Sequence, residues 1–264
     1  METGNTASDT VLVQQEGAIC TLRLNRPAKR NAFDAQTIHD LTVALNGAAC
    51  DRGVRVVVLT GAGEAFSSGA DLTWMASMVD FDYERNFADA GRLAQLLRTL
   101  YELPKPTVAR VNGHAFGGAL GLIACCDLAV AVDEAQFAFT EVRLGLAPAV
   151  ISPYVVRALG ARMAQRLFLT GEVFSAQNAL QWGLVSEVVG AAALDAVLNE
   201  RVAQLLRGGP RAAGVCKDLV NRADPVDHQV ERDAIATIAE LRCSAEGQEG
   251  IKAFLEKRKP GWSQ

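Results

Sequence analysis

Apolar and polar residues alternate in two short segments near the start of the chain. Residues 11–15 and 19–24 both show this period of two, and the Glu-Gly pair between them favours a turn, so together they predict a β-hairpin. Residues 54–60 are instead a nearly continuous β-branched run, which indicates a strand covered on both faces. Two further apolar runs are expected to be strands, at residues 107–111 and 128–132.

Helical patterns lie between these strands, and aspartates mark where two of the helices begin. Asp34 and Asp71 each stand before such a segment and are expected to cap it. The first of these helices would carry its apolar face on Ile38, Leu41, Ala44 and Leu45. A longer helix is expected over residues 86–103, ending before two prolines. This alternation predicts an α/β architecture in which ligands bind near the turns that follow strands.

The chain divides into three expected parts. Residues 1–10 are small and polar and should form a flexible N-terminus, whereas residues 11–207 should form the main α/β core. Helices dominate from residue 175 onward, and Arg207-Gly208-Gly209-Pro210 favours a break before a helical C-terminal region at residues 208–264.

Composition narrows the class of protein. Half of the 264 residues are apolar and 21% are charged, which is typical of a globular chain and excludes disorder. The formal net charge of −4 argues against nucleic acid or an anionic membrane as a partner. The six cysteines include no CxxC pair and there is no basic, apolar leader, so we expect a cytoplasmic protein without a metal site. Asp127 interrupts the most apolar segment, which argues against a membrane span.

Two turns of small residues are candidates for the chemistry. Gly117-Gly118 opens an apolar helix, and Ser68-Gly69-Ala70 follows another apolar segment. Each turn could direct a backbone N–H at one oxygen atom, which is how an oxyanion hole is built. The alternative is that both are simply tight turns with close helix packing.

Glu141 is the candidate acid or base. It lies in the run Phe137-Ala138-Phe139-Thr140-Glu141-Val142, where burial among apolar residues would raise its pKa toward neutrality. The alternative is an ordinary surface loop that carries Glu141 and Arg143.

With these motifs in order, the sequence resembles the crotonase, or enoyl-CoA hydratase/isomerase, superfamily over most of its length. The resemblance implies a crotonase-like spiral of ββα units with a helical C-terminal region that packs trimers or hexamers. It also implies an oxyanion hole for a thioester carbonyl at Ala70 and Gly118, with coenzyme A as part of the substrate and no separate cofactor. The matching motifs are Leu24-Asn25-Arg26-Pro27, Phe66-Ser67-Ser68-Gly69-Ala70-Asp71-Leu72, Val111-Asn112-Gly113, Gly117-Gly118, Cys126-Asp127, Ala135-Gln136-Phe137, Glu141 and Phe254-Leu255-Glu256-Lys257-Arg258.

One expected carboxylate is missing. Hydratases of this superfamily use a second glutamate three positions after the oxyanion glycine, where this chain has Gly121. A single carboxylate can run a 1,3-proton shift, so Δ3-Δ2 enoyl-CoA isomerisation is the alternative to hydration. A further alternative is a non-catalytic acyl-CoA-binding or assembly protein, against which the retained Glu141 argues.

A second resemblance favours hydration. Segments around residues 69–75, 115–122 and 141–153 are similar to a bacterial subgroup associated with methylglutaconyl-CoA and carboxygeranoyl-CoA hydration, in leucine and acyclic-terpene breakdown. That subgroup also lacks the first glutamate. The likeness implies a branched or carboxylated acyl group, for which Arg143 is the nearest cation in the motif.

The remaining candidate residues would hold the substrate. Residues 25–31 form a polar, basic loop that carries Arg26, Lys29 and Arg30. This basic loop is the local patch that coenzyme A phosphates would need, although a solvated turn explains it equally well. Trp74 and Met75 also fit an ordinary helix core. The expected coenzyme A contacts are Arg26, Lys29, Arg30 and Ser68, and the expected acyl pocket consists of Trp74, Met75, Gly121 and Val150.

Overall fold

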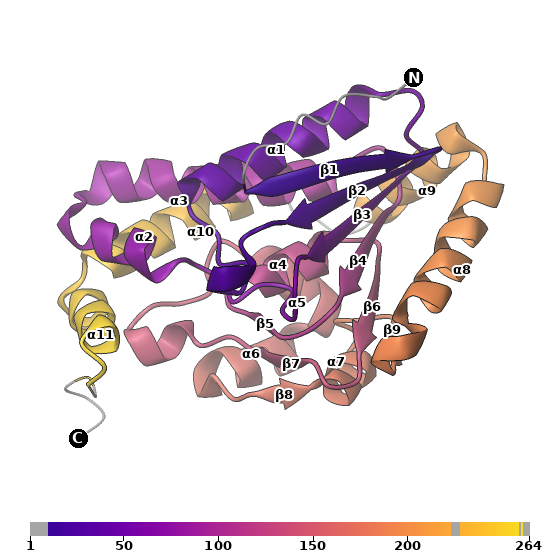
Figure 1. Cartoon of the computed structure of the whole chain (residues 1–264). Coiled ribbons are helices and arrows are strands. Elements are labelled where there is room, and N and C mark those ends of the chain that lie inside the picture. Colours follow the sequence, from indigo (N-terminus) through magenta and orange to yellow (C-terminus); the bar gives the residue numbers. More distant parts are fainter. Residues whose placement is uncertain (1–9, 223–227, 259, 261–264) are drawn as a thin grey trace.

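Six strands form the main sheet of the computed structural model, which describes residues 10–222, 228–258 and 260. The first two strands are the predicted antiparallel hairpin, and every other neighbouring pair in this sheet is parallel. In spatial order the strands are β1 (Val11–Glu16), β2 (Ile19–Leu24), β3 (Val56–Gly61), β4 (Thr107–Val111), β6 (Leu128–Val132) and β9 (Glu187–Val189) (Figure 1).

A second, smaller sheet lies beside the first. In it β5 pairs in parallel with β7, and β7 pairs antiparallel with β8. These strands are β5 (Ala115–Phe116), β7 (Gln136–Ala138) and β8 (Phe174–Ser175). The α/β class is therefore as predicted, but β5, β7, β8 and β9 are additional to the predicted strands. Each has only two or three residues, too few for a hydrophobic period to show.

Helices cover both faces of the main sheet (Figure 1). The α-helices are α1 (Ala35–Cys50), α2 (Leu72–Ser77), α3 (Tyr83–Tyr101), α4 (Gly118–Cys125), α5 (Ser152–Leu159), α6 (Ala161–Thr170), α7 (Ala176–Trp182), α8 (Leu194–Arg207), α9 (Pro210–Arg222), α10 (His228–Cys243) and α11 (Ala245–Leu255). Short 3-10 turns are η1 (Pro27–Lys29), η2 (Met78–Asp80), η3 (Glu141–Leu144) and η4 (Ala191–Ala193).

The predicted aspartate caps are present. Asp34 accepts a hydrogen bond from the Thr37 amide at the start of α1, and Asp71 accepts one from the Thr73 amide at the start of α2. Helix α3 begins three residues earlier than expected, because Asp82 caps it through the Arg85 amide. These caps satisfy amides that the helices leave without an internal acceptor.

Strand β3 is buried along its whole length, as its β-branched sequence predicts. Val57 and Leu59 point into the large core beneath α1 and α3, whereas Val56 and Val58 pack on the opposite face with Leu198 of α8. Because side chains alternate along a strand, the two faces belong to different cores. The strand is thus held between helices, and its carboxyl end leads into the turns of the candidate site.

The C-terminal helices return to the N-terminal half of the chain. Helix α10 packs along α3, and α11 contacts α2 and η3 (Figure 1). Helix α8 ends at Arg207 and α9 starts at Pro210, the position of the expected break. The predicted flexible N-terminus lies outside the described residues except for Thr10. None of the described helices has the length and apolar character needed to cross a bilayer.

Candidate active site

The two turns of small residues touch each other. Gly69 has a positive φ of 85°, and a Cβ atom built on it would lie 2.7 Å from the carbonyl oxygen of Phe116. The Phe116 amide also donates to the Ser67 carbonyl at 3.0 Å. Glycine is therefore required at position 69, since any side chain would separate the turns. This contact brings Ala70 beside Gly117 and Gly118.

The amides of Ala70 and Gly118 are free donors within the described part of the chain. The residues on either side of Ala70 bond to Phe33, through the Gly69 carbonyl at 2.8 Å and the Asp71 amide at 2.9 Å, but the Ala70 amide is not used. Gly118 is the first residue of α4, where amides have no acceptor inside the helix. Both residues line one cavity. The arrangement can place two N–H groups against one oxygen atom.

Glu141 lies next to this pair of turns. A Cβ atom on Gly117 would come 3.3 Å from Glu141 Oε1, so the carboxylate lies against the glycine turn. Its other oxygen, Oε2, is sealed from solvent and has no hydrogen-bond partner among the residues described. Burial raises the pKa of Glu141 to about 7, in the direction that its apolar neighbours predict. Such a carboxyl group can both release and accept a proton near neutral pH.

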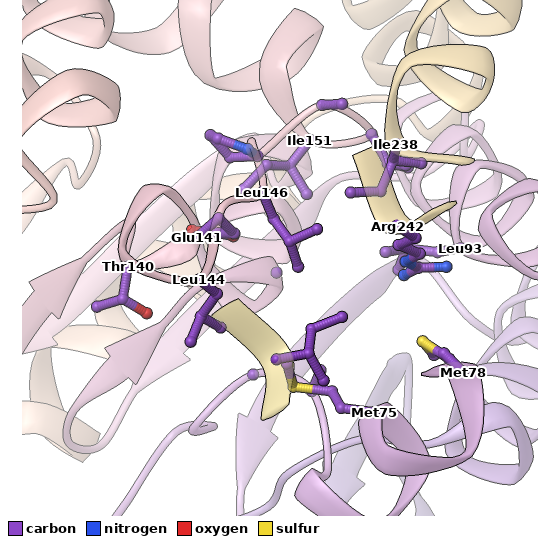
Figure 2. Close-up of a pocket in the computed structure, with 18 of the residues that line it drawn as sticks. Met75, Met78, Leu93, Thr140, Glu141, Leu144, Leu146, Ile151, Ile238 and Arg242 are labelled. Carbon is purple, nitrogen blue, oxygen red and sulfur yellow. The ribbon is translucent and has the colours of Figure 1, made fainter. Parts of the chain in front are cut away.

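The cavity beside Glu141 is mostly apolar (Figure 2). Two ionisable side chains line it in the described structure, Glu141 and Arg242. The expected pocket residues Trp74, Met75 and Val150 all line it, and Trp74 also packs against the core. Its other large apolar side chains are Phe33, Leu72, Met78, Leu93, Leu144, Leu146, Ile151, Ile238, Ile251 and Phe254.

Gly121 does not line the cavity, contrary to the sequence prediction. It is buried in α4, and a Cβ atom on it would overlap Cγ2 of Ile151 and lie 2.8 Å from Cβ of the same residue. Ile151 lines the cavity in its place. The position expected to hold a second glutamate is therefore filled by an isoleucine from another segment. Glu141 is the one carboxylate among the described residues that line this cavity.

The basic loop separates into paired and exposed cations. Arg26 Nη2 lies 2.7 Å and Lys29 Nζ 2.8 Å from Asp71 Oδ2, and Arg26 also pairs with Asp34 at 3.1 Å. Partial burial favours a higher pKa for Asp71, but hydrogen bonds from Lys29, the Thr73 amide and Arg26 outweigh it and lower the pKa to about 2.

Of the three expected cationic contacts with coenzyme A, Arg26 is the most enclosed. Its side chain is 16% exposed and holds the loop to α2, whereas half of the Lys29 side chain is exposed. Arg30 is exposed and no described residue forms an ion pair with it. Ser68 lines the cavity, and its hydroxyl donates to the Lys29 carbonyl at 3.3 Å. A ligand phosphate would thus meet Arg30 and Lys29 more readily than Arg26.

The cation in the cavity comes from a helix that the sequence pattern does not connect to the site. Arg143, the expected cation, is exposed and does not line the cavity, and its Nε lies 3.2 Å from the Cβ position of Gly171. Arg242 of α10 lines the cavity instead, together with Ile238, Ile251 and Phe254 of the C-terminal helices. Phe254 belongs to one of the motifs that carry the family resemblance, but no local pattern marks Arg242, Ile238 or Ile251. The packing of α10 on α3 and of α11 on α2 and η3 brings these side chains to the cavity.

Comparisons with known proteins agree with this geometry. Residues 14–264 match the model of the family described as enoyl-CoA hydratase/isomerase. An enoyl-CoA hydratase from Shewanella pealeana is 40% identical with a TM-score of 0.80, over 96% of each chain. Pseudomonas aeruginosa AtuE is 36% identical with a TM-score of 0.79, over 97% of this chain and 100% of AtuE.

The chain is also similar in sequence to a curated relative whose name describes its substrate. The Escherichia coli 2,3-dehydroadipyl-CoA hydratase is 33% identical over 255 residues, which cover 95% of this chain and 97% of the relative. The structural matches confirm the predicted crotonase-like fold, and they leave the methylglutaconyl-type subgroup without support of its own. With a family match over nearly its whole length, the chain belongs to the enoyl-CoA hydratase/isomerase family.

Proposed function

We propose that this protein adds water to an α,β-unsaturated acyl-CoA thioester. The observation that carries the proposal is the buried Glu141 carboxyl group lying against the glycine turn, beside the unused amides of Ala70 and Gly118. Relatives whose names describe hydration of enoyl-CoA compounds support the same reaction. The reaction class follows from a proton-transfer group and two fixed donors in one apolar cavity.

In the proposed reaction the amides of Ala70 and Gly118 hold the thioester oxygen. Glu141, as the carboxylate, takes a proton from water while the water oxygen bonds to Cβ of the substrate. The electron pair of the C=C bond moves toward the carbonyl and forms an enolate, whose negative charge the two amides stabilise more strongly than the neutral carbonyl. Glu141 then returns the proton to Cα, so one water molecule is added overall.

One carboxylate must perform both proton transfers in this scheme. Its pKa of about 7 suits that double role, because neither the ionised nor the protonated form is strongly favoured at neutral pH. The same observation supports the second candidate function, Δ3-Δ2 isomerisation. There Glu141 would remove a proton from C2 of a 3-enoyl thioester and return it to C4, without water.

The proposed acyl group is branched or carboxylated, of the methylglutaconyl type. The apolar lining that includes Met75, Leu146 and Val150 suits a branched chain, and the relative from Escherichia coli is named for a carboxylated substrate, 2,3-dehydroadipyl-CoA. Coenzyme A is proposed to lie along Ser68, Lys29 and Arg30. Assembly into trimers or hexamers through residues 208–264 and a cytoplasmic location also remain proposals.

Incubation with three thioesters tests the function. Crotonyl-CoA, 3-hexenoyl-CoA and 3-methylglutaconyl-CoA are followed by absorbance of the conjugated thioester and by product mass. A gain of one water supports hydration, whereas a mass-neutral shift of the double bond supports isomerisation and contradicts the main proposal. Binding of all three without turnover would identify a non-catalytic acyl-CoA-binding protein.

The Glu141→Gln variant tests the role of the carboxyl group. The amide keeps the size of the side chain but cannot exchange the proton, so turnover should fall by about a hundredfold or more while acyl-CoA binding persists. Normal turnover by a folded Glu141→Gln protein would remove Glu141 from the mechanism. Glu134→Gln is the matched control, because Glu134 is exposed and does not line the cavity.

A further inference from the structure

A single cationic side chain lines the acyl cavity in the described structure. Arg242 lies among Leu93, Met78 and Ile238, on the other side of the cavity from Glu141 (Figure 2). Its side chain is only 11% exposed. A guanidinium in apolar surroundings is costly unless an anion or a set of acceptors matches it. This position therefore calls for an explanation in terms of what binds there.

We propose that Arg242 binds the distal carboxylate of the substrate and so selects ω-carboxyl acyl-CoA thioesters. This inference rests on the proposed function, because it assigns the acyl end of the same site. It goes further because it names the residue that recognises the acyl group, and because it places the distal carboxylate of the substrate away from Glu141.

Asp89 of α3 is the protein group that holds Arg242. Its Oδ2 lies 3.4 Å from Arg242 Nη1, and its side chain is 2% exposed. This separation is at the long end for a charge-assisted hydrogen bond, which is normally nearer ~2.8 Å. Among the residues described, no other acceptor is bonded to the guanidinium. Arg242 therefore retains donors that Asp89 does not use, in a planar fork that matches a carboxylate.

The charges at this end of the cavity do not balance. Asp89 Oδ1 is bonded to Arg92 Nη2 at 2.9 Å, so one carboxylate serves two guanidinium groups. The three side chains together carry one net positive charge. Burial lowers the pKa of Arg242 from its ordinary value, as expected for a cation that its surroundings do not fully compensate. An anionic substrate group would complete the balance.

The other side chains of the cavity indicate where the double bond and the carboxylate of the ligand would lie. Apolar side chains separate Arg242 from Glu141, so a second anion is disfavoured near Glu141 and favoured near Arg242. Leu146 and Ile151 stand on the Glu141 side, whereas Met78 and Leu93 stand on the Arg242 side (Figure 2). The substrate class that fits is an enoyl thioester with its reactive double bond at Glu141 and a carboxylate at the far end of the acyl chain.

Binding of saturated acyl-CoA ligands tests the inference without any turnover. Succinyl-, glutaryl- and adipyl-CoA are compared by calorimetry with butyryl-, pentanoyl- and hexanoyl-CoA, which match them in chain length but lack the second carboxylate. We expect at least one dicarboxylic ligand to bind about tenfold or more tightly than its match, and Arg242→Met to abolish that ratio. Arg242→Lys should restore part of it, because charge returns without the fork.

Two controls keep the test decisive. Arg92→Gln removes the other cation on Asp89 and with it the net positive charge, but Arg92 does not line the cavity, so the ratio should fall much less than in Arg242→Met. Arg242→Met could unfold the protein because it leaves the buried Asp89 carboxylate without the Arg242 partner. In that case the double variant Asp89→Asn with Arg242→Met, which removes both charges, is measured instead. Equal binding of both ligand series, or a ratio that survives loss of Arg242, would overturn the inference. Failure of the proposed function would show separately, as absence of enoyl-CoA turnover with the binding ratio intact.

Discussion

Gly121 of α4 and Ile151 are packed so closely that a Cβ atom on the glycine would lie 2.8 Å from Ile151 Cβ and overlap its Cγ2. The glycine is thus required by packing, since it has an ordinary helical backbone and no positive φ. A glutamate could not enter this position without displacing Ile151 from the cavity wall. The contact between Gly121 and Ile151 therefore both excludes a second carboxylate and shapes the wall of the acyl cavity.

Gly121→Ala should therefore destabilise the protein. Overpacking against Ile151 is expected to cost about 1–3 kcal/mol of unfolding free energy, measured by urea denaturation. Gly91→Ala is the matched control, because nothing lies within 4 Å of a Cβ atom there, and it should gain about 0.5–1 kcal/mol from helix propensity. In a double-mutant cycle, Ile151→Ala should relieve part of the Gly121→Ala cost, and strict additivity would contradict the packing account.

The hydration rate should depend on ionisation of Glu141. Because its pKa is about 7 and the carboxylate is the form that activates water, kcat/KM should rise about tenfold per pH unit below pH 7 and level off above it. The measurement is kcat/KM for crotonyl-CoA between pH 5 and 9. A profile that is flat across pH 6 to 8 would argue that another group, or none, limits the reaction.

Glu141 should also make stability depend on pH. Its folded pKa of about 7 exceeds the ordinary 4.5, so the folded state binds the proton more tightly and stability falls as pH rises between these values. The loss is roughly 3 kcal/mol at most above pH 7. Glu141→Gln should remove this slope and be more stable than the parent at pH 8, with little difference at pH 4. Parallel stability curves for the two proteins would disprove the shift.

Gly118→Ala should disturb the proposed oxyanion hole. A Cβ atom there would lie 2.7 Å from Phe33 Cζ, so either the ring or the amide must move. Loss of one donor to the thioester oxygen is expected to lower kcat by about a hundredfold to a thousandfold. The infrared stretch of a ¹³C-labelled thioester carbonyl bound to the protein should move to higher frequency in the variant, because the bond is less polarised. An unchanged stretch and rate would exclude the Gly118 amide.

Arg26 and Arg30 of the basic loop should have different roles, Arg26 in stability and Arg30 in coenzyme A binding. Arg26→Gln breaks bonds to Asp71 and Asp34 and should cost about 1–3 kcal/mol of stability. Arg30→Gln alters an exposed side chain and should leave stability within about 0.5 kcal/mol, yet weaken coenzyme A binding about twofold to fivefold. Calorimetry with free coenzyme A at low and high salt measures the second effect, which salt should reduce. The reverse division between the two arginines would refute this account.

Interactions within a few residues follow from the amino-acid order alone. The Asp34 and Asp71 caps, strand β3 and the tight turn at Gly69 are each indicated by residue types adjacent in the sequence, and the structure contains all of them. The raised pKa of Glu141 is indicated in the same way, because Leu144 and Leu146, close to it in the chain, line the same apolar cavity. The Asp82 cap is not among the predicted ones, although the same rule applies to it.

Other features depend on residues far apart in the chain. The contact of Gly121 with Ile151, the pairing of Arg26 with Asp71 and the entry of Arg242 into the acyl cavity each join segments that are distant in the sequence. No local pattern encodes such a contact, because each depends on how complete elements pack. Arg143 is the natural choice of cation by proximity in sequence, but its side chain lies outside the cavity lining.

The sequence by itself determined the longer strands and the capped helices, the turns and the chemical groups available, because backbone propensity, capping and hydrophobic period act over short distances. Tertiary structure alone decided which groups share the cavity. It brought the turn at Gly69 against Phe116 and Gly117, filled the place of a second glutamate with Ile151 and set Arg242 opposite Glu141. These outcomes arise from close packing between distant segments, where one methyl group decides what can occupy a position.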